Sequence, residues 1–145
     1  NNDRDPDFSI GKTMPELTIT LPYAIPTLNV LMRTHYRRRA TQKLRMGREI
    51  LAQLGASRPA HPFERAHVVI ERHSTGTPDP DGAVGACKDL LDCLTTPSVQ
   101  ANGKVRNKYG MGLIRDDSPK HITLEVRPVR CKRGEEKTVV RVRET

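Results

Sequence analysis

Several acidic residues and one lysine are spaced along the chain so that they could meet in one site. In chain order they are Asp79, Asp81, Lys88, Asp92, Asp116 and Asp117. If a helix begins at Asp81, steps of seven and four residues place Asp81, Lys88 and Asp92 on one strip of its surface. Asp79 precedes that helix in an extended turn, and the later acid pair directly precedes a predicted strand. One acid of that pair could therefore meet the first two at a sheet edge facing the start of the helix.

Carboxylates gathered in this way could bind a divalent cation. Each carboxylate raises the pKa of its neighbours unless a cation offsets their repulsion. Mg²⁺ prefers oxygen ligands and needs only a few carboxylates. When bound, it can stabilise the charge of a phosphodiester under attack and lower the pKa of a water molecule. Lys88 could contact the scissile phosphate, so the pattern favours metal-dependent phosphodiester hydrolysis.

Each of these motifs also has a purely structural interpretation. Asp-Pro-Asp-Gly is a common turn, in which Asp81 would cap the following helix. Lys88 could simply pair with Asp92, four residues later on one helix face. Asp116-Asp117 before Ser-Pro could form an ordinary turn. Only the combination of the three motifs favours a nuclease site.

The chain carries an excess of basic residues that is concentrated in two segments. Lys and Arg number 25 against 17 Asp and Glu, a net charge of +8, which favours a polyanionic partner. One segment runs from Arg33 to Arg48 without an acid, and the other is the loop at residues 95–112. Either could be a solvated surface. The absence of acids from Arg33 to Arg48 favours phosphate contact there, whereas both interpretations stay open for the loop. The predicted DNA contacts in these segments are Arg33, Arg37, Arg38, Arg45, Arg48, Lys104, Arg106 and Lys108.

Composition argues against several other classes of protein. With no Trp, three Tyr and two Phe, a module that reads single strands by stacking bases on several aromatic rings is hard to build. No apolar run is long enough to span a bilayer, and no signal sequence is recognisable, so a cytoplasmic location is expected. The cysteines lack paired spacing. Reduced thiols, mostly in the core, are predicted for Cys87, Cys93 and Cys131.

Periodicity predicts one α+β domain over residues 14–145, after a polar leader or added segment at residues 1–13. Pro22 and Pro26 predict an extended segment after the first strand. The order β-α-β-α-β-β predicts a mixed sheet with two helices packed on it. The predicted elements are strand 16–21, helix 36–54, strand 67–72, helix 81–94, and strands 121–129 and 137–142. Each helix is predicted to bury one face. The core residues expected are Ala40, Leu44, Gly47, Leu51 and Leu54 from helix 36–54, and Val84, Cys87, Leu91 and Leu94 from helix 81–94.

Taken together, the motifs resemble one family of DNA enzymes. The pattern is similar to that of the RusA family of Holliday junction resolvases, which has D-P-D, then K-x-x-x-D-x-L on a helix, then D-D-S before a strand. In this chain it reads DPDGAVGACKDLLDCL followed by LIRDDSPKHITLEV. The early segment LPYAIPTLN also resembles the family's LP-x-x-P-(S/T)-x-N. The resemblance covers most of residues 16–127.

The resemblance implies an endonuclease that cuts branched DNA as a homodimer, with Mg²⁺ as cofactor or Mn²⁺ in its place. By position, Asp79, Asp81 and Asp117 match the family's metal-binding catalytic aspartates. Lys88 matches its active-site lysine, and Asn29 matches its early asparagine and is a further expected DNA contact. The chain differs from the family in having Gly82 in place of an asparagine, three extra residues before the lysine and a longer loop at residues 95–112. Two other interpretations are a non-catalytic nucleic-acid-binding protein and a basic protein whose acids only form turns.

Overall fold

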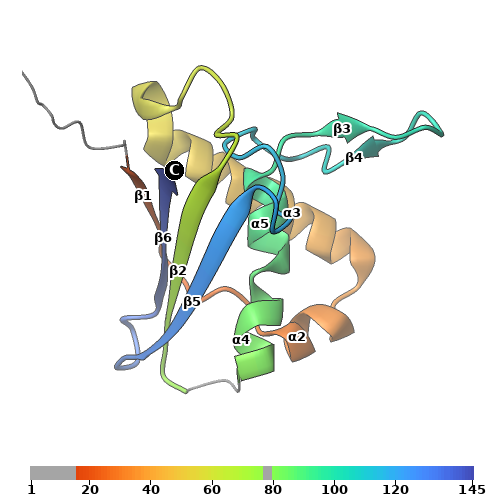
Figure 1. Cartoon of the computed structure of the whole chain (residues 1–145). Coiled ribbons are helices and arrows are strands. Elements are labelled where there is room, and N and C mark those ends of the chain that lie inside the picture. Colours follow the sequence, from red (N-terminus) through yellow and green to blue (C-terminus); the bar gives the residue numbers. More distant parts are fainter. Residues whose placement is uncertain (1–15, 77–79) are drawn as a thin grey trace, which may run out of the picture.

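The described helices lie on one face of a four-stranded sheet (Figure 1). The computed structural model describes residues 16–76 and 80–145, and the leader expected at residues 1–13 lies outside them. The arrangement is an α+β fold with a mixed sheet, as the sequence predicts. In the part of the chain that the structure describes, no helix combines the length and apolar character that crossing a membrane requires.

The predicted strands are all present in the main sheet. They are β1 (Glu16–Leu21), β2 (Ala66–Ser74), β5 (Ile122–Arg130) and β6 (Lys137–Glu144), in the spatial order β1-β6-β2-β5. β2 and β5 run parallel, whereas β6 is antiparallel to both of its neighbours. Parallel neighbours need a long crossover connection. The segment from β2 to β5 is that crossover, and it carries the acids and the lysine predicted to do chemistry.

The described helices lie in two connections, between β1 and β2 and between β2 and β5. They are α2 (Leu28–Arg33), α3 (Tyr36–Leu54), the 3₁₀ turn η1 (Gly55–Ser57), α4 (Pro80–Ala86) and α5 (Lys88–Leu94). Both predicted ends of α3 are confirmed. The extended segment predicted after Pro26 is wrong beyond Thr27, because the Thr27 side chain accepts the Val30 N–H and caps a helix there.

The single helix predicted over residues 81–94 is two helices that meet at Cys87. The Cys87 N–H donates to the Val84 carbonyl at 3.1 Å, a bond of the 3₁₀ type that changes the phase of the helix surface. Val84 is exposed rather than in the core. Instead, α4 approaches α2 through Gly85, where a Cβ would lie 2.7 Å from a methyl carbon of Leu28. Buried as predicted are Cys87, Leu91 and Leu94.

The inward face of α3 differs from the predicted apolar stripe. Its buried residues are Met46, Gly47, Ile50 and Leu54. Of the other stripe residues, Ala40 and Leu44 are half-buried and Leu51 is exposed. Nearer the N-terminus, Arg39 and Lys43 continue the inward face, because their side chains bind acids of α5. A stripe assigned from apolar residues alone places such charges outside, which explains the error.

The loop predicted to be irregular at residues 95–112 contains a hairpin that projects from the body of the protein (Figure 1). Its strands, β3 (Ser98–Val99) and β4 (Val105–Arg106), pair antiparallel. At the tip, Gly103 has a φ of 84° and its N–H donates to the Gln100 carbonyl at 2.9 Å. Asn102-Gly103, in the turn between Val99 and Val105, is a hairpin signal, so the sequence did contain the information.

Gly110 lies where the hairpin rejoins the core, and replacing it should destabilise the protein. A Cβ there would overlap the carbonyl oxygen of Thr95 and lie 3.0 Å from its carbonyl carbon. Since the obstacle is backbone, we expect Gly110→Ala to lower the free energy of unfolding by about 2 kcal/mol. Gly76→Ala is the matched control, because a Cβ at Gly76 would meet nothing within 4 Å. Equal urea midpoints for the two variants would contradict the packing described.

Candidate functional site

Lys88 and Asp117, both predicted to belong to the site, come together in the structure. Lys88 is the first residue of α5, and its Nζ lies 3.7 Å from Oδ2 of Asp117, in the loop that precedes β5. The same Nζ lies 3.3 Å from Oδ1 of Asp92, one helical turn later. The Ser118 carbonyl accepts the N–H groups of His121 and Ile122, which fixes the turn that leads from Asp117 into β5. Two distant parts of the chain therefore supply one charged cluster.

The other two predicted metal ligands lie outside the description. Asp79 is not among the described residues, and Asp81 is described only as part of the backbone of α4, not by its side chain. Among the residues that are described, no group of three or more His, Cys, Asp or Glu side chains could hold a metal ion. Asp117 is thus the described member of the predicted set of ligands.

A buried acid pair on α5 binds the inward cations of α3. Arg39 donates to Asp89 twice, from Nε at 3.2 Å and from Nη2 at 2.6 Å. Lys43 Nζ lies 3.1 Å from Oδ2 of Asp92 and 3.8 Å from Oδ1 of Asp89. The Asp89 and Asp92 side chains are only 5% and 11% exposed, and hydrogen bonding to Asp89 raises the pKa of Arg39. These contacts offset the charge of both acids and join α3 to α5.

These ion pairs between α3 and α5 were not predicted, although the spacing of their residues is visible in the sequence. Arg39 and Lys43 are four residues apart on a predicted helix, and Asp89 and Asp92 are three apart on another. Such spacings put each pair on one helix face. Only the packing of the two helices shows that the faces meet.

A groove lies between α3, α5 and the hairpin, with a volume of about 770 Å³. Its lining has one acid, Asp92, and two exposed aromatic residues, Tyr36 and Tyr109. Its cations are Arg39, Lys43, Lys88, Lys104 and Lys108. Positive charge therefore exceeds negative charge along the lining, which favours the binding of phosphates. Lys104 and Lys108 were predicted as DNA contacts, whereas Arg39 and Lys43 were not.

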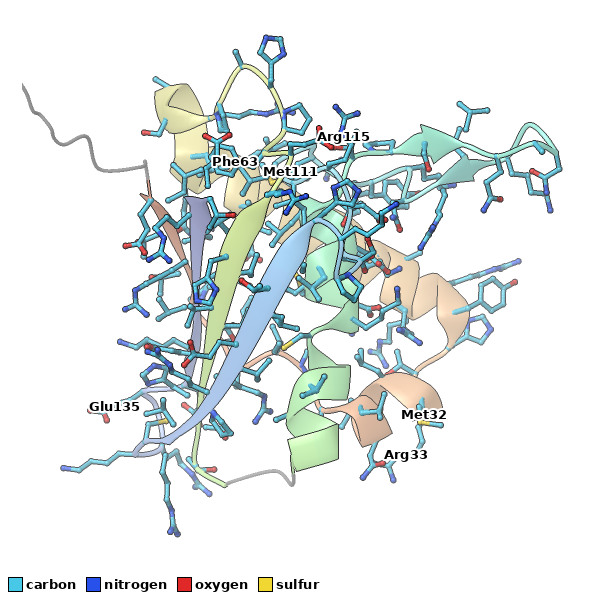
Figure 2. The ribbon with its side chains drawn as sticks, viewed as in Figure 1. Met32, Arg33, Phe63, Met111, Arg115 and Glu135 are labelled. Atoms are coloured by element: carbon cyan, nitrogen blue, oxygen red, sulfur yellow. The ribbon has the colours of Figure 1, made fainter. Side chains whose placement is uncertain are left out.

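The remaining predicted DNA contacts are not among the residues that line this groove. Arg106 faces a smaller pocket of about 260 Å³ that Arg115 and His121 also line. Arg45 and Arg48 line a shallow depression along the outer side of α3. Figure 2 shows Arg33 on α2, of which it is the last residue. Exposed, but in none of these pockets, are Asn29, Arg33, Arg37 and Arg38.

The cysteines supply no activated thiol to the groove. All three are free, and Cys93 lines the groove from its buried position on α5. Burial raises the pKa of Cys93 to about 12 and that of Cys87 to about 12. Cys131 is half-buried, at the far end of β5. Because a nucleophilic cysteine needs a lowered pKa, neither Cys87 nor Cys93 is suited to act as a nucleophile.

No model of a known protein family matches the chain, and no curated protein matches it. The similarity to RusA resolvases therefore depends on the quoted motifs alone.

Proposed function

We propose that the protein is a Mg²⁺-dependent endonuclease of the RusA type that cuts branched DNA. The observation that carries the proposal is the 3.7 Å contact between Lys88 Nζ and Asp117 Oδ2, made beside a groove rich in cations. An acid next to a phosphate-binding surface repels the phosphates of a substrate unless a cation lies between them. In metal-dependent cleavage of a phosphodiester, the metal ion bound by the acid is that cation.

Asp117, with Asp79 and Asp81, would hold the metal. Carboxylate oxygens are the ligands that Mg²⁺ prefers, and Asp117 has no described cationic partner at hydrogen-bonding distance, since Lys88 lies 3.7 Å away. Asp89 and Asp92 are less suited, because Arg39 and Lys43 already bind them. Bound Mg²⁺ would stabilise charge on the phosphate and lower the pKa of a water molecule.

The lysine and the groove have separate tasks in this proposal. Asp92 holds Lys88 on one side, so that its ammonium group stays next to Asp117 and can donate to a phosphate oxygen there. Lys104 and Lys108, on and beside the hairpin, would bind phosphates further along the strand. In the proposed homodimer, a two-fold axis would present two such sites to the symmetric strands of a four-way junction.

A second candidate function is non-catalytic binding of branched nucleic acid. It is favoured by the cations that already bind Asp89 and Asp92. The substitution of Gly82 for the family's asparagine points the same way. In that case the groove would still bind phosphates, but the acids would serve only to position Lys43 and Lys88.

A labelled four-way junction separates the two functions. We expect the chain to nick the junction in Mg²⁺, to leave a linear duplex of the same sequence intact, and to bind without nicking when EDTA replaces the metal. Binding that weakens with salt, without nicks in Mg²⁺ or Mn²⁺, would reject the nuclease and support the binding function. Equal affinity for junction and linear duplex would reject both.

A further inference from the structure

Two tyrosine rings from different parts of the chain line the groove. Tyr36 is the first residue of α3 and is 68% exposed, whereas Tyr109 follows the hairpin and is 38% exposed. They belong to a chain with only three Tyr and two Phe. The expectation that such a chain cannot easily stack bases was based on this small number of rings. The fold instead brings two of them to one surface.

Each ring has a cation next to it. The Arg37 guanidinium lies 5.8 Å from the centroid of the Tyr36 ring, and Lys108 Nζ lies 5.1 Å from that of Tyr109. The His35 ring stacks on Tyr36 with 4.5 Å between centroids, and His35 Nδ1 also accepts the Arg37 N–H at the start of α3. The stacked His35 ring covers one face of Tyr36, so a base would stack on the other face. An aromatic ring with an adjacent cation suits a nucleotide, since one group stacks on the base and the other binds phosphate.

The size of the groove limits what can enter it. Its volume of about 770 Å³ lies within the range of roughly 300–1,000 Å³ that encloses a drug-sized ligand. One or two nucleotides are of that size. In a duplex, moreover, neighbouring base pairs cover the faces of each base, and only an unstacked base offers a face to a side chain.

We infer that the groove takes an unpaired DNA strand, with bases against Tyr36 and Tyr109 and phosphates against Lys104 and Lys108. The inference rests on the proposed function and specifies its substrate: the bound feature is the short unpaired stretch at a branch point. Stacking on an aromatic side chain tolerates any base, so this binding does not depend on sequence.

Binding in EDTA tests the inference without requiring cleavage. The probes are a fluorescein-labelled strand of about eight thymidines and a blunt duplex. Loss of one stacking ring should raise the Kd for the single strand roughly 5- to 150-fold in Tyr36→Ala and in Tyr109→Ala, and leave the Kd for the duplex unchanged. Tyr36→Phe should bind like the original chain. The matched control is Met32→Ala, because Met32 is exposed on α2 outside the groove (Figure 2).

Intrinsic fluorescence gives a second readout. The chain has no Trp, so its emission comes from tyrosine, and stacking of a thymidine on Tyr36 or Tyr109 should quench it. The inference is overturned if the duplex competes as well as the single strand, or if both alanine variants bind the single strand normally. Quenching without nicking of any junction would reject the nuclease and retain the groove. Nicking of the junction together with normal single-strand binding by both alanine variants would retain the nuclease and reject the role of the groove.

Discussion

Asp117→Asn is expected to abolish the Mg²⁺-dependent nicking of a four-way junction while leaving the junction bound. The substitution keeps the shape of the side chain and removes the charge that would hold the metal. Asp117 is partly exposed, and its described ion pair with Lys88 is long, at 3.7 Å, so the fold should tolerate the change. Removing an acid beside a cationic groove lessens repulsion of phosphate, so binding should be unchanged or tighter. Nicking and gel-shift assays on one preparation measure both effects.

The neighbouring acid provides the control. Asp116 lines the smaller pocket with Arg106 and, unlike Asp117, has no described ion pair with Lys88, so Asp116→Asn should retain nicking. Lys88→Gln should slow nicking on the order of 10²-fold, as loss of one group that stabilises developing charge does. If Asp116→Asn abolishes nicking and Asp117→Asn does not, then Asp116, and not Asp117, corresponds to the catalytic aspartate of the RusA motif.

Local signals were enough to predict the frame that positions the site. Alternation of apolar residues predicted β1, in which Ile19 and Leu21 are buried, whereas β2 buries three consecutive residues, Val68, Val69 and Ile70. The start and end of α3 followed from its periodicity and from Gly55, which ends it with a φ of 48°. The contact of Lys88 with Asp117 was predictable because a helix start and a loop before a strand both lie in one crossover connection.

What sequence analysis missed depends on contacts between elements. Periodicity treats a charged side chain as outward, and nothing in α3 alone indicates that Arg39 and Lys43 turn inward. These two side chains turn inward because they bind Asp89 and Asp92, which are remote in the chain and buried by the same packing. The tyrosines of the groove were missed for a similar reason. Composition counts rings but does not show which of them the fold brings together.

The joint between α3 and α5 should be essential for stability, and Asp89→Asn tests it. The carboxylate is 5% exposed and accepts two hydrogen bonds from Arg39. Its neutral replacement leaves that guanidinium without its counter-charge and turns an amide N–H₂ group towards a donor. Removing one partner of a buried ion pair costs about 3–5 kcal/mol. Because the Arg39 side chain is 31% exposed and keeps some water, we expect about 3 kcal/mol, measured by urea unfolding.

An exposed ion pair provides the comparison. Arg115 Nε lies 3.3 Å from Glu64 Oε1 with both side chains largely in solvent, so Glu64→Gln should cost less than about 1 kcal/mol. Arg39→Gln with Asp89→Asn should be less destabilising than the sum of the two single changes, since the double variant leaves no unpaired charge. If Asp89→Asn costs no more than Glu64→Gln, the ion pair between Asp89 and Arg39 does not hold α3 against α5.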